Sequence, residues 1–426
     1  MKFDRAVIVG AGFSGLIAAR ILSDHFQSVI VIDKDECVGL SRPRSGVPQG
    51  AHLHVLLKQG QNILRTLFPA EKLFDQGNCP IIDWAADTKW ESMTGAFPRY
   101  NSDMKTYSFS RPFLEAGIHS LLAKRPNVSF IRSRVEGMIV ESNIATHICG
   151  QDLGFTWGAD LFVLAGGQNF PVNRFTDLIV DEPKFHIPIK IAYRSVVFET
   201  SSLRFDGFKQ YYYQMTPPHD PIGAVICPIE GGRSIATIVE YGEPTALKVD
   251  LDGFMNIARK VPGGRFAHII KDGRAFSDVS VFYKPSMYMR RPDQITGFPQ
   301  NVFCIGDVFC SLNPVFGQGM TSVLIQGELL AEMLKTESMS SNIFHAVSAS
   351  RLHMPFLLSK LGSDISASFS KRYLKTYLLR CQQSQKLHRK FLGALHLERP
   401  LSSLFDIPAL VSALLCKMPV TKLEKK

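Results

Sequence analysis

The chain has no C-x-x-C pair, no apolar run long enough to span a membrane, and no basic leader followed by an apolar stretch. Its eight cysteines are scattered, which is typical of free thiols in a reducing compartment and not of a disulfide framework or structural zinc site. A membrane-spanning helix needs about 20 consecutive apolar residues, and the first residues, MKFDRAVIVGAG, lead directly into a strand pattern instead of a signal peptide. These absences predict a soluble, cytoplasmic protein.

Acidic residues are scarce at the end of the chain. Residues 371–426 contain 12 Lys and Arg against three acids, so this segment holds +9 of the net charge of +10. Its mixture of cations with Leu, Phe and Tyr is typical of a solvated helical face, and also of an amphipathic helix at an anionic membrane. Peripheral membrane contact through this region is therefore one expectation, and no nucleic-acid partner is expected.

A glycine-rich turn follows the first predicted strand. In residues 3–35, two apolar runs flank GAGFSG (10–15), and a helical apolar stripe lies between them. In a G-x-G-x-x-G turn, the glycines permit a tight turn, close approach of a pyrophosphate, and packing of the helix on the strand. The helix start offers N–H groups to the phosphates. Asp33 ends the second strand, where it can bind a ribose hydroxyl, so a dinucleotide site is predicted.

A second turn, within FCIGDVFCSLNPVFGQGM (303–320), favours a flavin over a nicotinamide. Asp307 follows a strand and can hydrogen-bond a ribityl hydroxyl. Asn313-Pro314 and residues 317–320 form a loop that enters a helix, whose N–H groups would face the electron-rich pyrimidine edge of a flavin. The two turns together predict FAD.

With these motifs, the chain resembles the FAD-dependent aromatic hydroxylase superfamily, a glutathione-reductase-like group of monooxygenases. Within it, the chain is similar to polyether-forming flavin epoxidases and, more distantly, to squalene epoxidase. The resemblance is carried along nearly the whole chain by GAGFSG with Asp33, PRSGVPQGAHLH, SRPFLEAGI, ADLFVLAGG, GDVFCSLNPVFGQGMT and the C-terminal QKLHRKFLGALHLERPLSSLFDIPAL. It departs from the pattern at Ala51, where relatives often have arginine, and at residues 164–167, where they often have Asp-Ala-Ser/Thr-Gly.

The resemblance implies roles for individual residues. Arg44 would reach the FAD phosphates or the ring edge, Arg111 the ribityl and phosphate region, and the backbone of Val135 the adenine. The complete expected cofactor set is Gly10, Gly12, Phe13, Ser14, Gly15, Asp33, Lys34, Arg44, Arg111, Val135, Gly166, Gly306, Asp307, Pro314, Gly317, Gly319 and Met320. Pro314, His52 and Val47 are expected near the reactive part of the flavin, with no catalytic residue assigned.

The same patterns predict the architecture. We expect an α/β fold in which a Rossmann-like FAD-binding domain is interleaved with an antiparallel β substrate domain, followed by C-terminal helices. The FAD-binding domain would comprise 1–77, 98–170 and 301–335. The substrate domain would comprise 78–97 and the mostly β segment 171–300, and a basic helical region would occupy 336–426.

Two further groups keep alternative interpretations. His52 and His54 have the spacing of a metal-ligand pair, but no third ligand cluster accompanies them, so flavin or substrate contact or a structural role is favoured and no metal is expected. Tyr211, Tyr212 and Tyr213 alternate faces of a predicted strand. Tyr211 and Tyr213 are candidates for the substrate pocket, and an ordinary half-buried strand explains them equally well.

The resemblance implies a flavin monooxygenase. Reduced FAD and O₂ would form a C4a-hydroperoxide that transfers one oxygen to a lipophilic alkene or an activated aromatic ring. No second G-x-G-x-x-G is present, so NADPH or NADH would bind transiently, or a partner reductase would supply reduced flavin. The alternatives are a reductase or dehydrogenase of the prenyl-lipid reductase type and a flavin-bound protein without catalysis. A halogenase is disfavoured because the chain has no Trp-x-Trp-x-Ile-Pro element.

Overall fold

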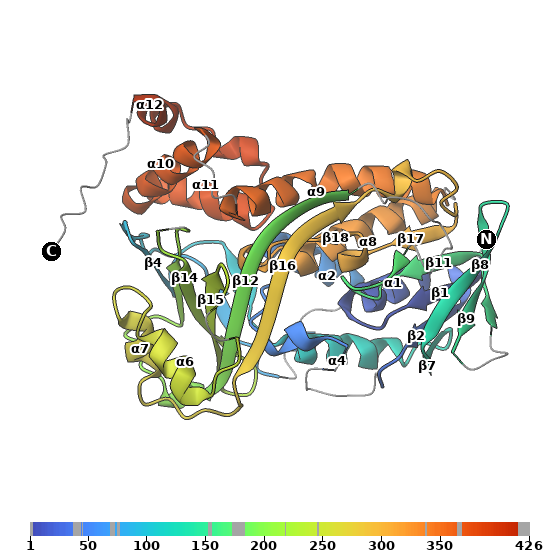
Figure 1. The fold of residues 1–426 in the computed structure, drawn as a ribbon, viewed down its shortest axis with the longest axis horizontal. Coiled ribbons are helices and arrows are strands. Elements are labelled where there is room, and N and C mark those ends of the chain that lie inside the picture. Colours follow the sequence, from blue (N-terminus) through green and yellow to red (C-terminus); the bar gives the residue numbers. More distant parts are fainter. Residues whose placement is uncertain are drawn as a thin grey trace.

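Figure 1 shows the computed structural model, an elongated molecule with two main sheets. The structure describes residues 3–36, 44, 46–68, 73–74, 77–151, 156–172, 184–217, 219–244, 247–336, 339–363 and 369–415. All statements below concern these residues.

The first sheet is parallel and has five strands in the order β17-β11-β1-β2-β7. These strands are β1 (Phe3–Val9), β2 (Phe26–Asp33), β7 (Val128–Arg132), β11 (Leu161–Leu164) and β17 (Val302–Cys304). β11, β17 and the second half of β1 are buried, as their continuous apolar runs predict for a parallel sheet covered on both faces.

Helices cover this sheet. α1 (Phe13–Leu22) packs against α4 (Arg111–Leu122) and against α8 (Gly319–Lys335), which in turn contacts α2 (Lys58–Leu67) and α9 (Ser341–Ser363). A small sheet of β8 (Val135–Glu141), β9 (Ile144–Gly150) and β10 (Thr156–Gly158) lies beside it. Because the strands of the first sheet are parallel, the carboxyl ends of β1, β2, β11 and β17 lie at one edge of it.

The second sheet has eight strands in the order β18-β16-β12-β15-β14-β13-β4-β5, and all pairs except β13–β4 are antiparallel. The strands are β4 (Thr88–Ser92), β5 (Gly95–Ala96), β12 (Lys184–Glu199), β13 (Gln210–Gln214), β14 (Ile222–Ile229), β15 (Arg233–Tyr241), β16 (Ser280–Arg290) and β18 (Cys310–Ser311). In Figure 1 the long strands β12 and β16 run from this sheet towards the parallel sheet.

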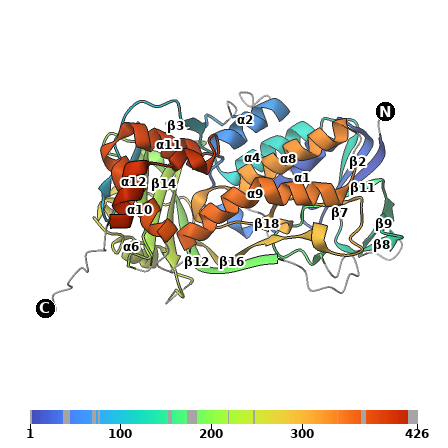
Figure 2. The same ribbon diagram turned by 90° about the horizontal axis from the view of Figure 1, so that it is seen from above.

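The remaining elements surround the eight-stranded sheet. α6 (Leu251–Ala258) and α7 (Arg265–Ile270) cover it, and β3 (Ile81–Asp83) pairs separately with β6 (Lys105–Tyr107). The C-terminal helices α10 (Phe369–Gln383), α11 (Gln385–Leu395) and α12 (Ile407–Leu415) gather at the end of the molecule away from the parallel sheet in both Figure 1 and Figure 2.

The predicted fold class is confirmed, because a parallel Rossmann-like sheet alternates along the chain with an antiparallel sheet and is followed by helices. The domain boundaries stay predictions. β4 and β5, from 78–97, join the eight-stranded sheet, but so does β18, which lies inside the segment 301–335. The segment 301–335 therefore contributes strands to both sheets.

Candidate functional site

A cavity of about 910 Å³ is lined by residues of both sheets and of the C-terminal helices. Its volume is at the upper end of the roughly 300–1,000 Å³ of ordinary ligand pockets. One part of its wall is the β1–α1 turn, another is the loop 307–320, and a third consists of apolar side chains. These three parts are described in turn.

The β1–α1 turn has the geometry that the glycine motif predicts. Gly10 adopts φ of +104°, and a Cβ there would lie 2.6 Å from the carbonyl oxygen of Ala165. A Cβ on Gly15 would lie 1.8 Å from the carbonyl oxygen of Gly10, so this glycine lets α1 pack on β1. Gly12 is open, since the atoms nearest to an added Cβ are guanidinium nitrogens of Arg44 and Arg111 at 3.9 Å.

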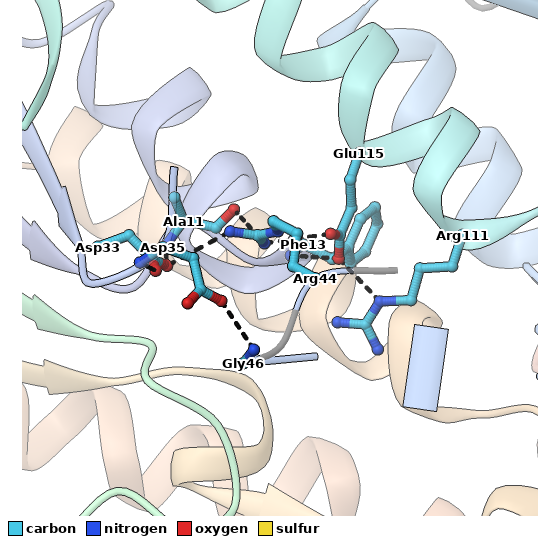
Figure 3. A network of polar contacts seen from close by, with 8 residues as sticks. All are labelled: Ala11, Phe13, Asp33, Asp35, Arg44, Gly46, Arg111 and Glu115. Atoms are coloured by element: carbon cyan, nitrogen blue, oxygen red, sulfur yellow. Dashed lines mark hydrogen bonds and ion pairs between the residues drawn. The ribbon is translucent and has the colours of Figure 1, made fainter. Parts of the chain in front are cut away.

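The two arginines are held by a buried carboxylate, as Figure 3 shows. Glu115 Oε1 accepts hydrogen bonds from Arg111 Nε at 2.7 Å and from the backbone N–H of Phe13 at 3.0 Å. Its Oε2 accepts from Arg44 Nη2 at 3.3 Å. Although burial opposes ionisation, the arginines and these hydrogen bonds hold the pKa of Glu115 below its usual value. Two cations are thus fixed beside an open helix start, where they can bind phosphates.

Arg44 is also tied to the strand ends. It donates to the carbonyl of Ala11 at 3.0 Å and lies 3.6 Å from Asp33 Oδ2. Asp33 accepts from the backbone N–H of Ala11 at 2.6 Å and of Asp35 at 2.8 Å, while it still lines the cavity. The two positions expected for Arg44, at the phosphates or at the ring edge, stay predictions.

The second part of the wall is the loop 307–320. Asp307 lines the cavity, and its carboxylate makes no hydrogen bond or ion pair with any residue in the described part of the chain. Asn313 accepts the N–H of Val315 and donates to Tyr241 Oη at 2.8 Å, which fixes the turn at Pro314. A free carboxylate beside a rigid turn at the start of α8 can bind a polyhydroxyl chain.

Lys284 is a buried cation at this part of the cavity that the sequence analysis does not single out. Its Nζ donates to Ser311 Oγ at 2.6 Å and to Gln168 Oε1 at 3.0 Å. Burial lowers the pKa of Lys284, and nearby Asp307 acts in the opposite direction. The one signal for it is a lone lysine at an alternating, inward position of the apolar strand SVFYKPSMYMR.

His52 and His54 both line the cavity. His52 Nδ1 is hydrogen-bonded to Ser195 Oγ at 2.7 Å, and His54 Nδ1 to the carbonyl of His52 at 3.0 Å. Burial lowers the pKa of His52 to about 4 and that of His54 to about 3, so both imidazoles are neutral at pH 7. Among the described residues, no group of three or more His, Cys, Asp or Glu side chains could hold a metal ion.

The third part of the wall is apolar and lies mainly under the C-terminal helices. Its aromatic and leucine side chains are Trp84, Trp90, Tyr212, Leu374, Leu378, Phe391, Leu395, Leu401 and Leu404. No charged side chain belongs to this group. This end of the cavity is suited to an uncharged, lipophilic molecule.

Most of the expected site residues line this one cavity. Of the cofactor set, these are Gly10, Gly12, Phe13, Ser14, Asp33, Lys34, Arg111, Val135, Gly166, Asp307, Pro314, Gly317, Gly319 and Met320, and Val47 and His52 join them. Gly15, Gly306 and Arg44 are not among the residues that line it. Gly306 has φ of +71° and packs against Ser14, so its role is to bring β17 close to α1.

The assignment of Tyr211 to the substrate pocket is wrong. Tyr211 is fully buried on the other face of β13, where it packs against Phe208 and Phe266 and donates to Glu91 Oε2 at 3.1 Å. Its neighbour Tyr212, on the opposite face of the strand, lines the cavity. Tyr213 shares the face of Tyr211 and still contributes to the wall, and its hydroxyl is committed to Asp220.

A search for membrane-crossing segments finds no helix of sufficient length and hydropathy among the described residues. Pro43 and Ser45 of PRSGVPQGAHLH, and residues 416–426 of the basic C-terminus, lie outside the described residues.

Comparisons with known proteins agree with this geometry. Residues 8–75 match a family model described as an NAD(P)-binding Rossmann-like domain. Protein Rv3254 of Mycobacterium tuberculosis is 25% identical over 367 residues, which cover 79% of this chain and 74% of that protein.

Solved structures share the fold over almost the whole chain. A triple mutant of the flavin-dependent brominase Bmp2 has a TM-score of 0.69 at 15% identity and covers 96% of this chain and 97% of its own. The p-nitrophenol 4-monooxygenase PnpA from Pseudomonas putida DLL-E4 has a TM-score of 0.67 at 15% identity and covers 95% and 99%. Residues 8–75 are therefore similar to a Rossmann-like domain, and the chain has the fold of this brominase and this monooxygenase.

Proposed function

We propose that this protein, which has the fold of flavin-dependent oxygenases and halogenases, is an FAD-dependent monooxygenase. Its substrate is a lipophilic alkene, which it epoxidises, or an activated aromatic ring, which it hydroxylates. The observation that carries the proposal is one cavity that joins a phosphate-binding turn, a flavin-type loop and an apolar compartment.

The chemistry of the described residues fits the successive parts of FAD. Gly12 leaves open space at the start of α1, and Arg44 and Arg111 stand beside that space with their guanidinium groups oriented by Glu115. Asp33 is suited to the adenosine ribose and the unpaired carboxylate of Asp307 to the ribityl chain. Pro314 and residues 317–320 would face the isoalloxazine ring.

When bound, reduced flavin would supply the electrons that activate O₂, and O₂ would supply the oxygen atom that is transferred. The chain's own residues bind the substrate, orient it and exclude water. Trp84, Trp90 and Tyr212 form an apolar wall that favours a lipophilic molecule over water. Because the flavin would carry out the oxygen chemistry and the protein would only bind and orient the substrate, the site needs no nucleophile or metal cluster of its own.

The substrate specificity is tested by supplying the flavin-loaded protein with O₂, a reductant and panels of lipophilic alkenes and phenols. Mass spectrometry of the products should show the gain of one oxygen atom, with NADH, NADPH or a partner flavin reductase as the electron source. Anaerobic turnover without O₂ consumption would indicate the prenyl-lipid reductase type instead. A protein that retains FAD but is inert to every reductant would indicate a non-catalytic flavoprotein, and bromide-dependent products a halogenase.

A further inference from the structure

His52 is fixed on one side by two hydroxyl groups of the eight-stranded sheet. Its Nδ1 is 2.7 Å from Ser195 Oγ, which is 2.7 Å from Thr237 Oγ1. Ser195 on β12 and Thr237 on β15 are direct cross-strand partners, so their side chains lie on the same face. Both are buried, and the chain of three groups sets the orientation of the imidazole ring.

The other side of the ring is unsatisfied. His52 is only 4% exposed, yet its Nε2 has no hydrogen-bond partner within the described part of the chain. The same is true of Tyr193 Oη, on a side chain that is 7% exposed. A buried polar atom without a partner is destabilising, so two such atoms in one cavity wall indicate a ligand that pairs with them.

The two atoms belong to one place in the cavity. Tyr193 is two residues before Ser195 on β12, on the same face of the strand, and its ring centroid is 6.0 Å from that of His52. Phe282, opposite Tyr193 on β16, lies 6.1 Å from the imidazole and supplies an apolar side wall. All three residues line the cavity.

This place adjoins the loop assigned to the flavin ring. A Cβ on Gly317 would lie 3.2 Å from Cβ of Val55, and the backbone N–H of Leu57 donates to Thr321 Oγ1 in the first turn of α8. The segment 52–57 is therefore fastened to the loop 314–319 and the start of α8. A molecule held by His52 would lie next to that loop.

We infer that His52 Nε2 and Tyr193 Oη together bind one hydroxyl group of the substrate. The inference rests on the proposed function and narrows its substrate class to lipophilic molecules that carry a hydroxyl group. In the tautomer whose Nδ1–H is donated to Ser195, Nε2 is an acceptor, and the phenol of Tyr193 can donate. One acceptor and one donor match a hydroxyl, which donates one hydrogen bond and accepts another.

His52 binds this hydroxyl without removing its proton. A phenol has an ordinary pKa of about 10, whereas burial lowers the pKa of His52 to about 4. The other titratable groups in the cavity wall on the elements around it are His54 on its own segment, Tyr193 on β12, Tyr212 on β13, Tyr241 on β15, Lys284 on β16 and Asp307 after β17. Asp307 acts on Lys284, whereas burial alone shifts the pKa of His52, so no carboxylate stabilises its imidazolium and His52 is a positioning residue.

The test uses the flavin-loaded protein and two probes of the same shape, 2-naphthol and 2-methoxynaphthalene. Their dissociation constants are measured from changes in flavin absorbance. The wild type should bind the naphthol about tenfold more tightly, as expected for a buried hydrogen-bonding group. His52→Phe and Tyr193→Phe should each abolish most of this preference while the bound flavin is retained.

Tyr283→Phe is the matched control, because its hydroxyl contacts exposed Glu243 instead of the cavity. Equal binding of the two probes to the wild type, or an unchanged preference in Tyr193→Phe, would overturn the inference. Equally tight binding of 2-acetonaphthone would indicate that the two residues bind a carbonyl group and not a hydroxyl. That result would also contradict the inference. Failure to retain flavin in the wild type would instead contradict the proposed function.

An independent observation concerns the outer face of α12. Ile407, Val411 and Leu414 are 64%, 45% and 62% exposed, and their spacing of four and three residues puts them on one helix face. Phe405, just before the helix, is 57% exposed. Ala409 on the opposite face is buried, so α12 is held against the protein while this apolar face points away from it.

The helices next to α12 carry exposed basic residues. Exposed Arg372 and Lys375 lie on α10, which packs directly against α12, and Lys386 and Arg389 are exposed on the next helix, α11. α10 also contributes Leu374 and Leu378 to the apolar end of the cavity. The same helices thus connect a basic, apolar outer surface with the compartment proposed for the substrate.

We propose that the apolar face of α12 docks on the surface of an anionic lipid bilayer. Apolar side chains enter the boundary of the acyl chains, and surrounding cations attract acidic headgroups. The test is co-sedimentation of the full-length protein with phosphatidylcholine vesicles that contain or lack about a third phosphatidylglycerol. Binding should require phosphatidylglycerol and fall at least tenfold in the variant Ile407→Gln/Val411→Gln/Leu414→Gln.

Ile343→Gln on α9, also an exposed isoleucine, is the control and should bind as the wild type does. Equal binding to both kinds of vesicle, or unchanged binding of the triple variant, would contradict a membrane-docking face. A concentration-dependent dimer that dissociates in the triple variant without any vesicle binding would assign the face to a second copy of the chain.

Discussion

At the scale of single residues, the site depends on where glycine is needed and where it only leaves room. Gly10 and Gly15 are required by the fold, since an added Cβ would collide with backbone atoms at 2.6 and 1.8 Å. A Cβ on Gly12 would meet no atom closer than 3.9 Å, so the fold does not require glycine at this position. Packing therefore does not explain the absence of a side chain at Gly12.

Gly12→Glu should abolish FAD retention and leave the fold intact. The new carboxylate would occupy the phosphate position and pair with Arg44 or Arg111, which are the nearest groups. Absorbance of the purified protein near 450 nm, about the usual flavin maximum, reports retention, and circular dichroism reports the fold. Gly137→Glu on β8, where nothing lies within 4 Å, should retain the flavin. A yellow Gly12→Glu protein would show that the cofactor assignment is wrong.

Asp307→Ala should weaken FAD binding by about tenfold, which corresponds to the loss of one charged hydrogen bond of about 1.4 kcal/mol. Because the carboxylate makes no hydrogen bond or ion pair among the described residues and acts on Lys284 only through its charge, the stability of the flavin-free protein should change less than flavin binding does. The measurements are a flavin titration and thermal unfolding of the apoprotein. Unchanged flavin affinity would remove Asp307 from the binding site.

At the scale of elements, Glu115 joins α4 to α1 and to the segment after β2. It accepts a backbone N–H from the first turn of α1 and hydrogen bonds from two arginines of different segments. A buried carboxylate with two cationic partners stabilises an assembly as long as all three are present. This single residue therefore couples stability to the orientation of the phosphate-binding cations.

Glu115→Ala should lower the free energy of unfolding by about 3–5 kcal/mol, the usual effect of leaving buried charges unpaired. It should also weaken FAD binding, because Arg44 and Arg111 lose their common partner. Urea unfolding and a flavin titration measure the two effects. Glu141→Ala, at an exposed position on β8, is the matched control. An effect on neither quantity would mean that Glu115 is only a surface-type ion pair.

At the scale of the whole molecule, neutral histidines are buried in several parts of the core. Burial lowers the pKa of His345 and His396 to about 3 and that of His388 to about 4. His345 and His396 each accept a backbone N–H, of Cys304 and Lys58 respectively, which needs an unprotonated nitrogen. Protonation of these histidines at acid pH should therefore weaken the contacts of the helices and turns that carry them.

The free energy of unfolding should fall as the pH drops from about 6.5, the pKa of an unfolded histidine, towards 4. Each buried histidine binds a proton more readily in the unfolded chain, which costs up to about 1.4 kcal/mol per pH unit. Urea unfolding at pH 7, 6 and 5 measures this slope. His345→Gln/His396→Gln should flatten it, and an identical slope in that variant would exclude these residues as its source.

The sequence by itself determined the features that depend on local backbone geometry. Apolar runs with glycine at GAGFSG are sufficient for the β1–α1 turn, and a strand followed by GD and a proline-containing loop is sufficient for the wall at Asp307 and Pro314. The parallel and antiparallel sheets follow from apolar periodicity in the same way. These patterns are local because steric limits and burial act on neighbouring residues.

Only the tertiary structure decided which distant side chains meet. Glu115 lies between Arg44 and Arg111, and His52 lies against Ser195 and Thr237, although nothing in their sequence spacing indicates either contact. Likewise, strand alternation identifies two faces around Tyr212 but not which face borders the cavity. The physical reason is that strand register and helix packing, which bring distant segments together, result from burial of the whole core.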